Sequence, residues 1–118
     1  LARYKEYYME DVRTVLISYG ASARSALHVV RKARAKGDRM GLLELQTLWP
    51  FPAHIVQERC ANARIVLVVE MNMGQVIESV RAAVDHPEVV FLANRVDGEL
   101  ITPTNIRNFL RVIQGRGV

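Results

Sequence analysis

Short runs of consecutive apolar residues alternate along the chain with longer segments of helical periodicity. The runs are rich in Val, Leu and Ile and do not alternate polar with apolar positions. Continuous apolar strands are typical of a sheet that is covered on both faces. We expect strands at 14–19, 64–70 and 89–93, and a weaker one at 40–45.

The segments between these runs place apolar residues three and four positions apart, as the buried face of a helix requires. One segment begins after Gly20 and ends at Gly37, a residue type that favours helix C-termini. Two more segments follow Pro52 and Gly74. The last begins at Thr102, a good N-terminal cap that is followed by a proline suited to the first helical turn.

This order of strands and helices predicts a single α/β domain, a three-layer α/β/α sandwich around a mostly parallel sheet. We expect the domain to occupy residues 14–118. Residues 1–13 carry tyrosines among charged side chains, and we interpret them as a linker or short helix that leads into the domain.

Composition is consistent with a globular protein and excludes several classes. Of the 118 residues, 50% are hydrophobic and 24% are charged. No apolar run reaches the roughly 18–20 residues of a membrane span, and the first residues lack a secretory signal. We therefore predict a cytoplasmic location and no membrane contact. Because the chain begins with Leu1 in place of Met, we expect a segment excised from a longer polypeptide.

The candidate catalytic and metal-binding residues form no known constellation. A single cysteine, Cys60, excludes a disulfide framework and an iron–sulfur cluster held by this chain alone. Cys60 lies on the apolar face of its helix, so we expect a buried, inert thiol. The histidines and serines have neither metal-ligand spacing nor a nucleophile elbow: His28, His54, His86, Ser18, Ser22 and Ser25. We assign no catalytic residue and no metal ligand.

Basic residues are in excess, with a formal charge of +4 and a pI near 9.6. Many of them lie between Arg24 and Arg39, on or near one predicted helix. A solvated helix face, a subunit interface and a contact with an anionic ligand all fit this pattern. Nucleic acid is disfavoured, because no aromatic residues interleave with the charges.

Three loops follow strands at the edge of the sheet where α/β proteins bind their ligands. In the first, Gly20 permits a tight turn and Ser22 is suited to cap the helix. The free N–H groups of a helix start, with Arg24 nearby, also suit an anion. Both interpretations stay open, so Gly20, Ser22 and Arg24 are candidate anion contacts.

The second loop, residues 46–52, holds Trp49 and Phe51 beside two prolines. A stiff apolar loop of this kind either packs on its own domain or contacts a neighbour. In the third loop, residues 70–75, Asn72 is suited to cap the next helix. Glu70 and Gln75 are polar groups directed to where a partner or ligand would lie.

Taken in order, these loops resemble the C-terminal domain of the alpha subunit of 2-oxoacid:ferredoxin oxidoreductases. The resemblance runs from about Asp11 to Ile113, and its most specific pair is Leu48–Pro52 with Met71–Gln75. It implies a fold like the transketolase C-terminal domain, with a five-stranded, mainly parallel sheet. A fifth strand would then lie in Tyr4–Met9 or around Glu99–Thr102. The matching stretches are Val15–Arg24, Gly41–Leu43, Thr47–Pro52, Val68–Gln75, Asn94–Gly98 and Thr102–Pro103.

The resemblance also implies a parent enzyme that oxidatively decarboxylates a 2-oxoacid to its acyl-CoA and reduces ferredoxin. Thiamine diphosphate, Mg²⁺, an iron–sulfur cluster and coenzyme A would be bound outside this domain. The domain itself would be a non-catalytic assembly element. It would contact the N-terminal domain of the same alpha subunit and the beta, and in some enzymes gamma and delta, subunits. Its interface residues would be Trp49, Phe51, Glu70, Asn72 and Gln75.

Two alternatives remain at this point. One is the C-terminal domain of another thiamine diphosphate enzyme, either transketolase or a 2-oxoacid dehydrogenase component. The other is a stand-alone module that binds coenzyme A or a nucleotide.

Overall fold

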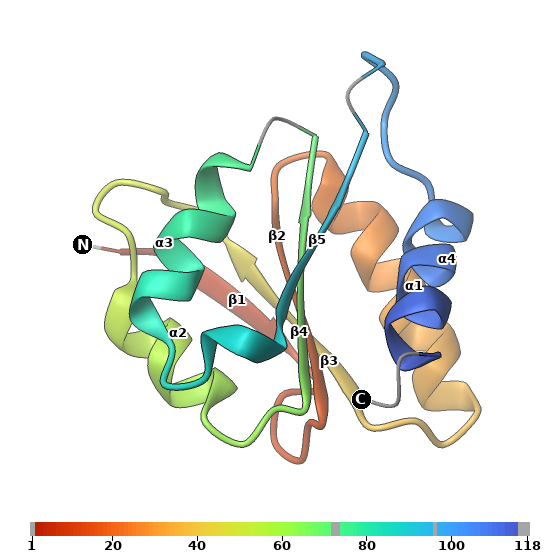
Figure 1. Cartoon of the computed structure of the whole chain (residues 1–118), viewed down its shortest axis with the longest axis horizontal. Helices are drawn as coiled ribbons and strands as arrows, with labels where there is room; N and C mark the ends of the chain where they lie inside the picture. The colour runs from red at the N-terminus through yellow and green to blue at the C-terminus, as the bar shows by residue number, and fades with distance from the viewer. Residues whose placement is uncertain (1, 72–73, 96, 116–118) are drawn as a thin grey trace.

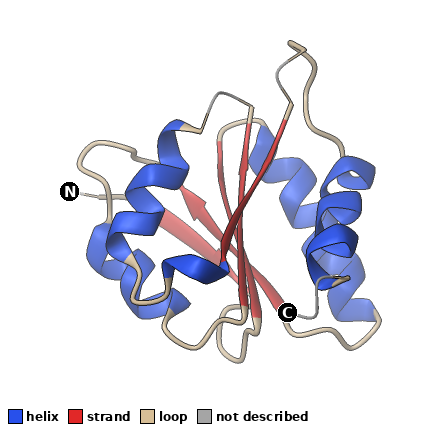
Figure 2. Ribbon diagram, viewed as in Figure 1, coloured by secondary structure: helices blue, strands red, loops and turns tan. Residues whose placement is uncertain are grey.

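The computed structural model describes residues 2–71, 74–95 and 97–115, which form a three-layer α/β/α sandwich (Figure 1, Figure 2). Its five-stranded sheet has the order β1-β3-β2-β4-β5, in which only β1 runs antiparallel to its neighbour. This is the fold class that the sequence predicts. The strands are β1 (Tyr4–Tyr7), β2 (Thr14–Tyr19), β3 (Met40–Leu45), β4 (Ile65–Glu70) and β5 (Val90–Asn94).

Two helices cover each face of the sheet. Helices α1 (Ser22–Ala35) and α4 (Pro103–Gln114) lie on one face, and α2 (Ala53–Cys60) and α3 (Gln75–Ala83) lie on the other (Figure 1). A short 3₁₀ turn, η1 (Pro87–Val89), precedes β5. None of the helices that the structure describes has the length and apolar content of a segment that crosses a membrane.

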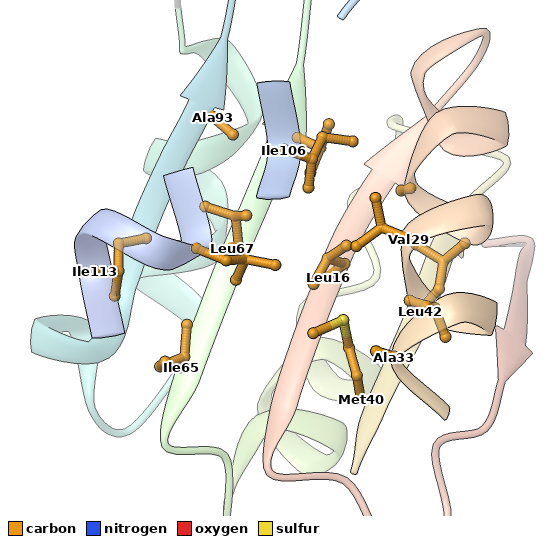
Figure 3. Packing of buried hydrophobic residues seen from close by; sticks show 14 of the residues in the cluster. Leu16, Val29, Ala33, Met40, Leu42, Ile65, Leu67, Ala93, Ile106 and Ile113 are labelled. Carbon is orange, nitrogen blue, oxygen red and sulfur yellow. The ribbon is translucent and has the colours of Figure 1, made fainter. Parts of the chain in front are cut away.

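The continuous apolar strands fill both cores. Successive side chains of a strand point to opposite faces, so Leu16 packs toward α1 and α4 while Val15 and Ile17 pack toward α2 and α3. Strand β4 is buried along its whole length. Figure 3 shows side chains of α1 and α4 meeting the central strands. The labelled core residues are Leu16, Val29, Ala33, Met40, Leu42, Ile65, Leu67, Ala93, Ile106 and Ile113.

The N-terminal residues correct one expectation. Residues Tyr4–Tyr7 form β1, in which Tyr4 lies opposite Leu45 and Tyr7 opposite Leu42. The interpretation of 1–13 as a linker or short helix is wrong for these residues, and the first of the two places considered for a fifth strand is confirmed. The strand has no apolar run because it lies at the edge of the sheet, where Lys5 and Glu6 stay exposed.

Helix ends agree with the sequence at two of three predicted positions. Thr102 accepts a hydrogen bond from Asn105 N–H, and Asn105 accepts one from Thr102 N–H, a complete capping box at α4. Gly37, with φ of 88°, follows the end of α1. Ser22 is not the cap of α1: Ala21 holds that position without a side-chain hydrogen bond, and Ser22 is 2% exposed inside the first turn.

Candidate functional site

The carboxyl ends of the four parallel strands lie side by side, and they bring the three predicted loops to one edge of the sheet. In the ladder, Tyr19 of β2 lies opposite Leu45 of β3, and Glu70 of β4 lies opposite Asn94 of β5. In Figure 1 the turn after β2 and the segment between β5 and α4 lie toward the top, and the loop after β3 lies at the upper left. We describe this edge as the candidate functional site.

Glu70 is the buried charge at the centre of this edge. Its side chain has no exposed surface. Its carboxylate accepts hydrogen bonds from Val76 N–H at 3.2 Å and Ile77 N–H at 3.1 Å, in the first turn of α3. The hydroxyl of Tyr19 donates a third, at 3.2 Å. A carboxylate here satisfies free N–H groups and interacts favourably with the positive end of the helix.

The buried position corrects the expectation that Glu70 contacts a partner. The carboxylate is used inside the domain, where it fixes the start of α3 to the end of β4. Sequence reasoning placed the cap of α3 at Asn72, which lies outside the described residues. The signal for Glu70 was present, since a carboxylate ends an apolar strand six residues before the helix, but only the fold shows where it points.

The loop between β3 and α2 separates its two aromatic side chains. Trp49 is 87% exposed, whereas Phe51 is half-buried and packs against the core beneath α2 and α3. The base of the loop is fastened to the chain just before β1, because Arg3 N–H donates to Thr47 Oγ1 at 2.6 Å and Thr47 N–H donates to Arg3 O at 3.1 Å. The sequence left self-packing and interface open, and the structure assigns self-packing to Phe51 and leaves Trp49 outside.

The loop between β2 and α1 turns through Gly20, whose φ of 60° lies in the left-handed region that favours glycine. Its three candidate anion contacts do not share one environment. Gly20 and Arg24 are exposed, whereas Ser22 is buried. The structure therefore does not bring these three residues together as one exposed cradle.

Gln75 is exposed as the first residue of α3, and the residue before it, Gly74, is left-handed with φ of 87°. A Cβ atom on Gly74 would lie 3.4 Å from Ile77 Cγ2 and 3.6 Å from Leu92 Cδ2. This glycine turns the chain from the third loop into the helix. Gln75 therefore faces solvent at the same edge as Trp49.

The segment between β5 and α4 carries an ion pair that sequence reasoning missed. Arg95 donates from Nη2 to Asp97 at 2.6 Å and from Nη1 to Asn105 at 3.3 Å. The Arg95 guanidinium lowers the pKa of the Asp97 carboxyl. A signal for this pair was present in the sequence, because an Arg and an Asp stand two positions apart in Asn94–Gly98. That stretch was used above only as one of those that resemble the family.

The described residues of this edge are better suited to binding another protein than to catalysis. Among residues 2–71, 74–95 and 97–115, no three His, Cys, Asp or Glu side chains lie together as ligands for a metal ion. The thiol of Cys60 is 5% exposed, as expected, and burial raises its pKa to about 12. An exposed indole, an exposed amide and a surface ion pair suit recognition by another protein surface.

Comparison with known proteins identifies a family and related folds. Residues 13–106 match the family described as pyruvate:ferredoxin oxidoreductase core domain II. The chain is 40% identical over 113 residues to ketoisovalerate oxidoreductase subunit VorB of Methanothermobacter marburgensis, covering 96% of this chain and 32% of that subunit. It therefore spans about a third of the length of this curated relative.

Two solved structures share the fold at low sequence identity. The 2-oxoglutarate:ferredoxin oxidoreductase from Magnetococcus marinus, with 2-oxoglutarate, coenzyme A and succinyl-CoA bound, superposes with a TM-score of 0.83 at 20% identity. The match covers 94% of this chain and 19% of that one. A split-gene transketolase, an inactive beta4 tetramer, superposes with a TM-score of 0.71 at 16% identity, covering 96% of this chain and 40% of the other. The transketolase-like fold is thus confirmed.

Proposed function

The chain belongs to the pyruvate:ferredoxin oxidoreductase core domain II family, and from this premise we propose that it is an assembly domain of a 2-oxoacid:ferredoxin oxidoreductase. Its homologues are alpha-type subunits, and the domain corresponds to part of such a subunit. The whole enzyme would decarboxylate a 2-oxoacid, transfer the acyl group to coenzyme A and reduce ferredoxin. This domain would hold that assembly together and take no part in the bond-breaking steps.

The observation that carries the proposal is the exposure of Trp49. The side chain of Trp49 is 87% exposed and therefore presents a large apolar surface to water. Tryptophan is enriched at the interface positions that contribute most to binding between proteins. Phe51 and the Arg3–Thr47 hydrogen bonds hold the loop in place from below, so the indole is presented by a fixed backbone. Gln75 adds an exposed amide at the same edge. We propose Trp49, Gln75 and Asn72 as the interface, with Phe51 as the support beneath the loop, and we leave Glu70 out of it.

The cofactors of such an enzyme do not fit the residues of this chain. An iron–sulfur cluster is held by about four thiolates. The single thiol of this chain, that of Cys60, is buried among apolar side chains. The described residues contain no group of three or more His, Cys, Asp or Glu side chains that could hold a metal ion. They therefore provide no binding site for the Mg²⁺ that accompanies thiamine diphosphate. We therefore place thiamine diphosphate, Mg²⁺ and the cluster on other parts of the enzyme. We propose the same for coenzyme A, as the family resemblance implies, and we derive no chemical step from this domain.

The proposed partners are the N-terminal domain of the same subunit and the beta subunit, with gamma and delta subunits where the enzyme has them. Ferredoxin is a partner of the whole enzyme. We propose a cytoplasmic location, and neither nucleic acid nor membrane as a partner. The relatives differ in substrate, since one is named for ketoisovalerate and a structural neighbour contains 2-oxoglutarate. We expect the residues that select the 2-oxoacid to lie outside this domain.

The test replaces Trp49 in the complete alpha-type subunit and measures assembly with the remaining subunits by native mass spectrometry. Trp49→Ala should weaken assembly at least tenfold, because truncating a central aromatic contact typically costs about 2 kcal/mol or more. The matched control is His86→Ala, which removes another exposed aromatic ring. His86 lies just before η1, away from the loops that follow the strands.

Adding Asn72→Ala should weaken assembly further, and 2-oxoacid-dependent reduction of ferredoxin should fall in parallel. Unchanged assembly and unchanged turnover in the Trp49→Ala, Asn72→Ala double variant would show that this edge is not an interface. An equal loss in His86→Ala would show that the effect is not specific to this edge.

A further inference from the structure

Helices α1 and α4 carry positive charge and no negative charge. Neither helix contains Asp or Glu, whereas α2 and α3 each carry one acidic and one basic residue. One basic residue of α1, Arg34, is used within the domain, where it binds Asp11 and the backbone oxygens of Tyr8 and Met40. Six other basic residues, five on these helices and Lys36 directly after α1, make no ion pair within the described residues: Arg24, Arg31, Lys32, Lys36, Arg107 and Arg111.

The two helices lie side by side on the sheet (Figure 1). Their side chains line a groove of about 540 Å³. Four of the six basic residues line it: Lys32, Lys36, Arg107 and Arg111. Its floor consists of the core residues Val29, Ala33, Met40 and Leu110, the first three of which are labelled in Figure 3. Among the described residues that line the groove, Asp38 is the one that carries a carboxylate. The groove thus joins an apolar floor to a basic rim.

Arg107 adds a second observation. Its Nη1 is buried and has no hydrogen-bond partner among the described residues, while Nη2 is 3.4 Å from Thr104 Oγ1. A buried guanidinium N–H without an acceptor is rare in folded proteins. Arg107 also lines the groove, so a carboxylate bound there would pair with the charge of its guanidinium.

From these observations we propose that the groove between α1 and α4 is the docking site for an acidic segment of a partner subunit. This inference rests on the proposed function, which supplies the partner subunits. Carboxylates of that segment would pair with Lys36, Arg107 and Arg111, and an apolar side chain between them would lie on the floor of the groove.

The distribution of charge selects an extended protein segment over a small anion. Arg24 and Arg31 lie outside the lining of the groove, and Arg24 is about 18 Å from Lys36 along a helix. A small anion in the groove would therefore leave part of this positive charge unpaired. The groove also lies beside Met40, the first residue of β3, at the edge opposite to the one where α/β sheets bind small ligands. Phe109 is the only Phe, Tyr or Trp of either helix and packs against the core, and the exposed ring of His28 lies outside the lining of the groove. The groove therefore has no aromatic platform for base stacking.

The lysines provide a direct test in the complete enzyme. The chain has three, Lys5, Lys32 and Lys36, and two of them line the groove. In the assembled enzyme, Lys32 and Lys36 should react with an acetylating reagent at least tenfold more slowly than in the separated subunit, with Lys5 as the reference for reagent activity. Carbodiimide treatment of the assembled enzyme should join Lys32 or Lys36 to an Asp or Glu of another subunit.

A pair of matched variants tests the energetics. Arg111 and Arg81 each lie in the last turn of a helix, but Arg111 lines the groove and Arg81 lies on the other face of the sheet. Arg111→Glu should weaken subunit assembly at least tenfold and flatten its dependence on salt. Arg81→Glu should leave both unchanged.

Several results would overturn the docking site. The first is equal acetylation of Lys32 and Lys36 in the assembled and separated states. The second is cross-linking of these lysines only to residues of this subunit. The third is an equal loss of assembly in Arg111→Glu and Arg81→Glu. Protection that disappears on nuclease treatment would assign the surface to nucleic acid and overturn it as well. If purified subunits do not assemble and do not reduce ferredoxin with a 2-oxoacid, the proposed function fails and this inference fails with it. If they assemble with freely reactive Lys32 and Lys36, the inference alone fails.

Discussion

The carboxylate of Glu70, at the end of β4, accepts a 3.1 Å hydrogen bond from the backbone N–H of Ile77 in the first turn of α3. Together with the bond from Val76 N–H, it replaces the side-chain cap that α3 lacks at Gly74. The interaction links a central strand to a helix on the surface. It therefore determines where the exposed Gln75 lies relative to the other loops of the edge.

Replacing this carboxylate should destabilise the domain. Glu70→Gln removes the charge and turns one acceptor into a donor that faces N–H groups, so we expect the free energy of unfolding to fall by about 2 kcal/mol. Urea denaturation measures it. Glu78→Gln is the control, because Glu78 lies in the first turn of the same helix but is exposed, and its loss should cost about 0.5 kcal/mol. Equal losses in the two variants would contradict a special role for Glu70.

Gly41 should not tolerate a side chain. A Cβ atom at this position would lie 2.6 Å from both Tyr8 O and Val12 Cγ1. The carbonyl of Tyr8 is held by a 2.8 Å hydrogen bond from Arg34, so it does not move away freely. We expect Gly41→Ala to lower the free energy of unfolding by about 2 kcal/mol or more.

The control for Gly41 is Gly115→Ala. Gly115 has a helical φ of −67°, and the nearest atom to its added Cβ is 3.3 Å away. This variant should change stability by about 1 kcal/mol or less, since alanine favours helical backbone. A Gly41→Ala protein as stable as the Gly115→Ala protein would show that the turn between β1 and β2 adapts without cost.

Asp11 should titrate below its usual range because of Arg34. The hydrogen bond from the Arg34 guanidinium lowers the pKa of Asp11 from 3.8. A lowered pKa in the folded state means that this pair contributes stability above pH 3.8, which is lost as the pH falls through the folded-state pKa. In Arg34→Gln, carboxyl NMR should show the Asp11 midpoint moving upward toward its ordinary value.

Asp97 is the internal reference for this titration. Its pKa is lowered by Arg95 and does not depend on Arg34, so its midpoint should stay in place in the Arg34→Gln variant. If the midpoint of Asp11 also stays in place, the contact between Arg34 and Asp11 does not persist in solution.

The thiol of Cys60 should be unreactive in the native protein. Burial raises its pKa from 9.0 to about 12, which lowers the thiolate fraction near neutral pH about a thousandfold. Labelling with a thiol-specific disulfide reagent at pH 8 should proceed only as fast as the domain opens, and should be immediate in denaturant. Rapid labelling of the native protein would place Cys60 outside the core.

Most of the fold was predictable from local pattern. The continuous apolar runs of β2, β4 and β5 and the caps at Gly37 and Thr102 are local signals, and they predicted parallel strands between covering helices. Strand β1 was not predictable in the same way, because an edge strand of four residues with two exposed charges has no apolar run. Its pairing with β3 depends on contacts about forty positions away in the sequence.

The candidate site was predictable as a set of loops, but not in its details. Sequence order places the ends of parallel strands at one edge, so the loops after β2, β3 and β4 had to meet there. Which of Trp49 and Phe51 packs inward depends on the path of the loop over the second core. The inward direction of Glu70 likewise depends on the position of α3, which the sequence does not give.

The sequence by itself determined the family, the alternation of strands and helices, and the absence of acidic residues from α1 and α4. These properties are read from neighbouring positions, since helical and strand periodicity and charge are local. Only the tertiary structure decided that Glu70 is an internal cap, that Trp49 is exposed, and that Lys32 and Arg111 line one groove. Each of these depends on packing between segments far apart in the chain, and local periodicity carries no information about that packing.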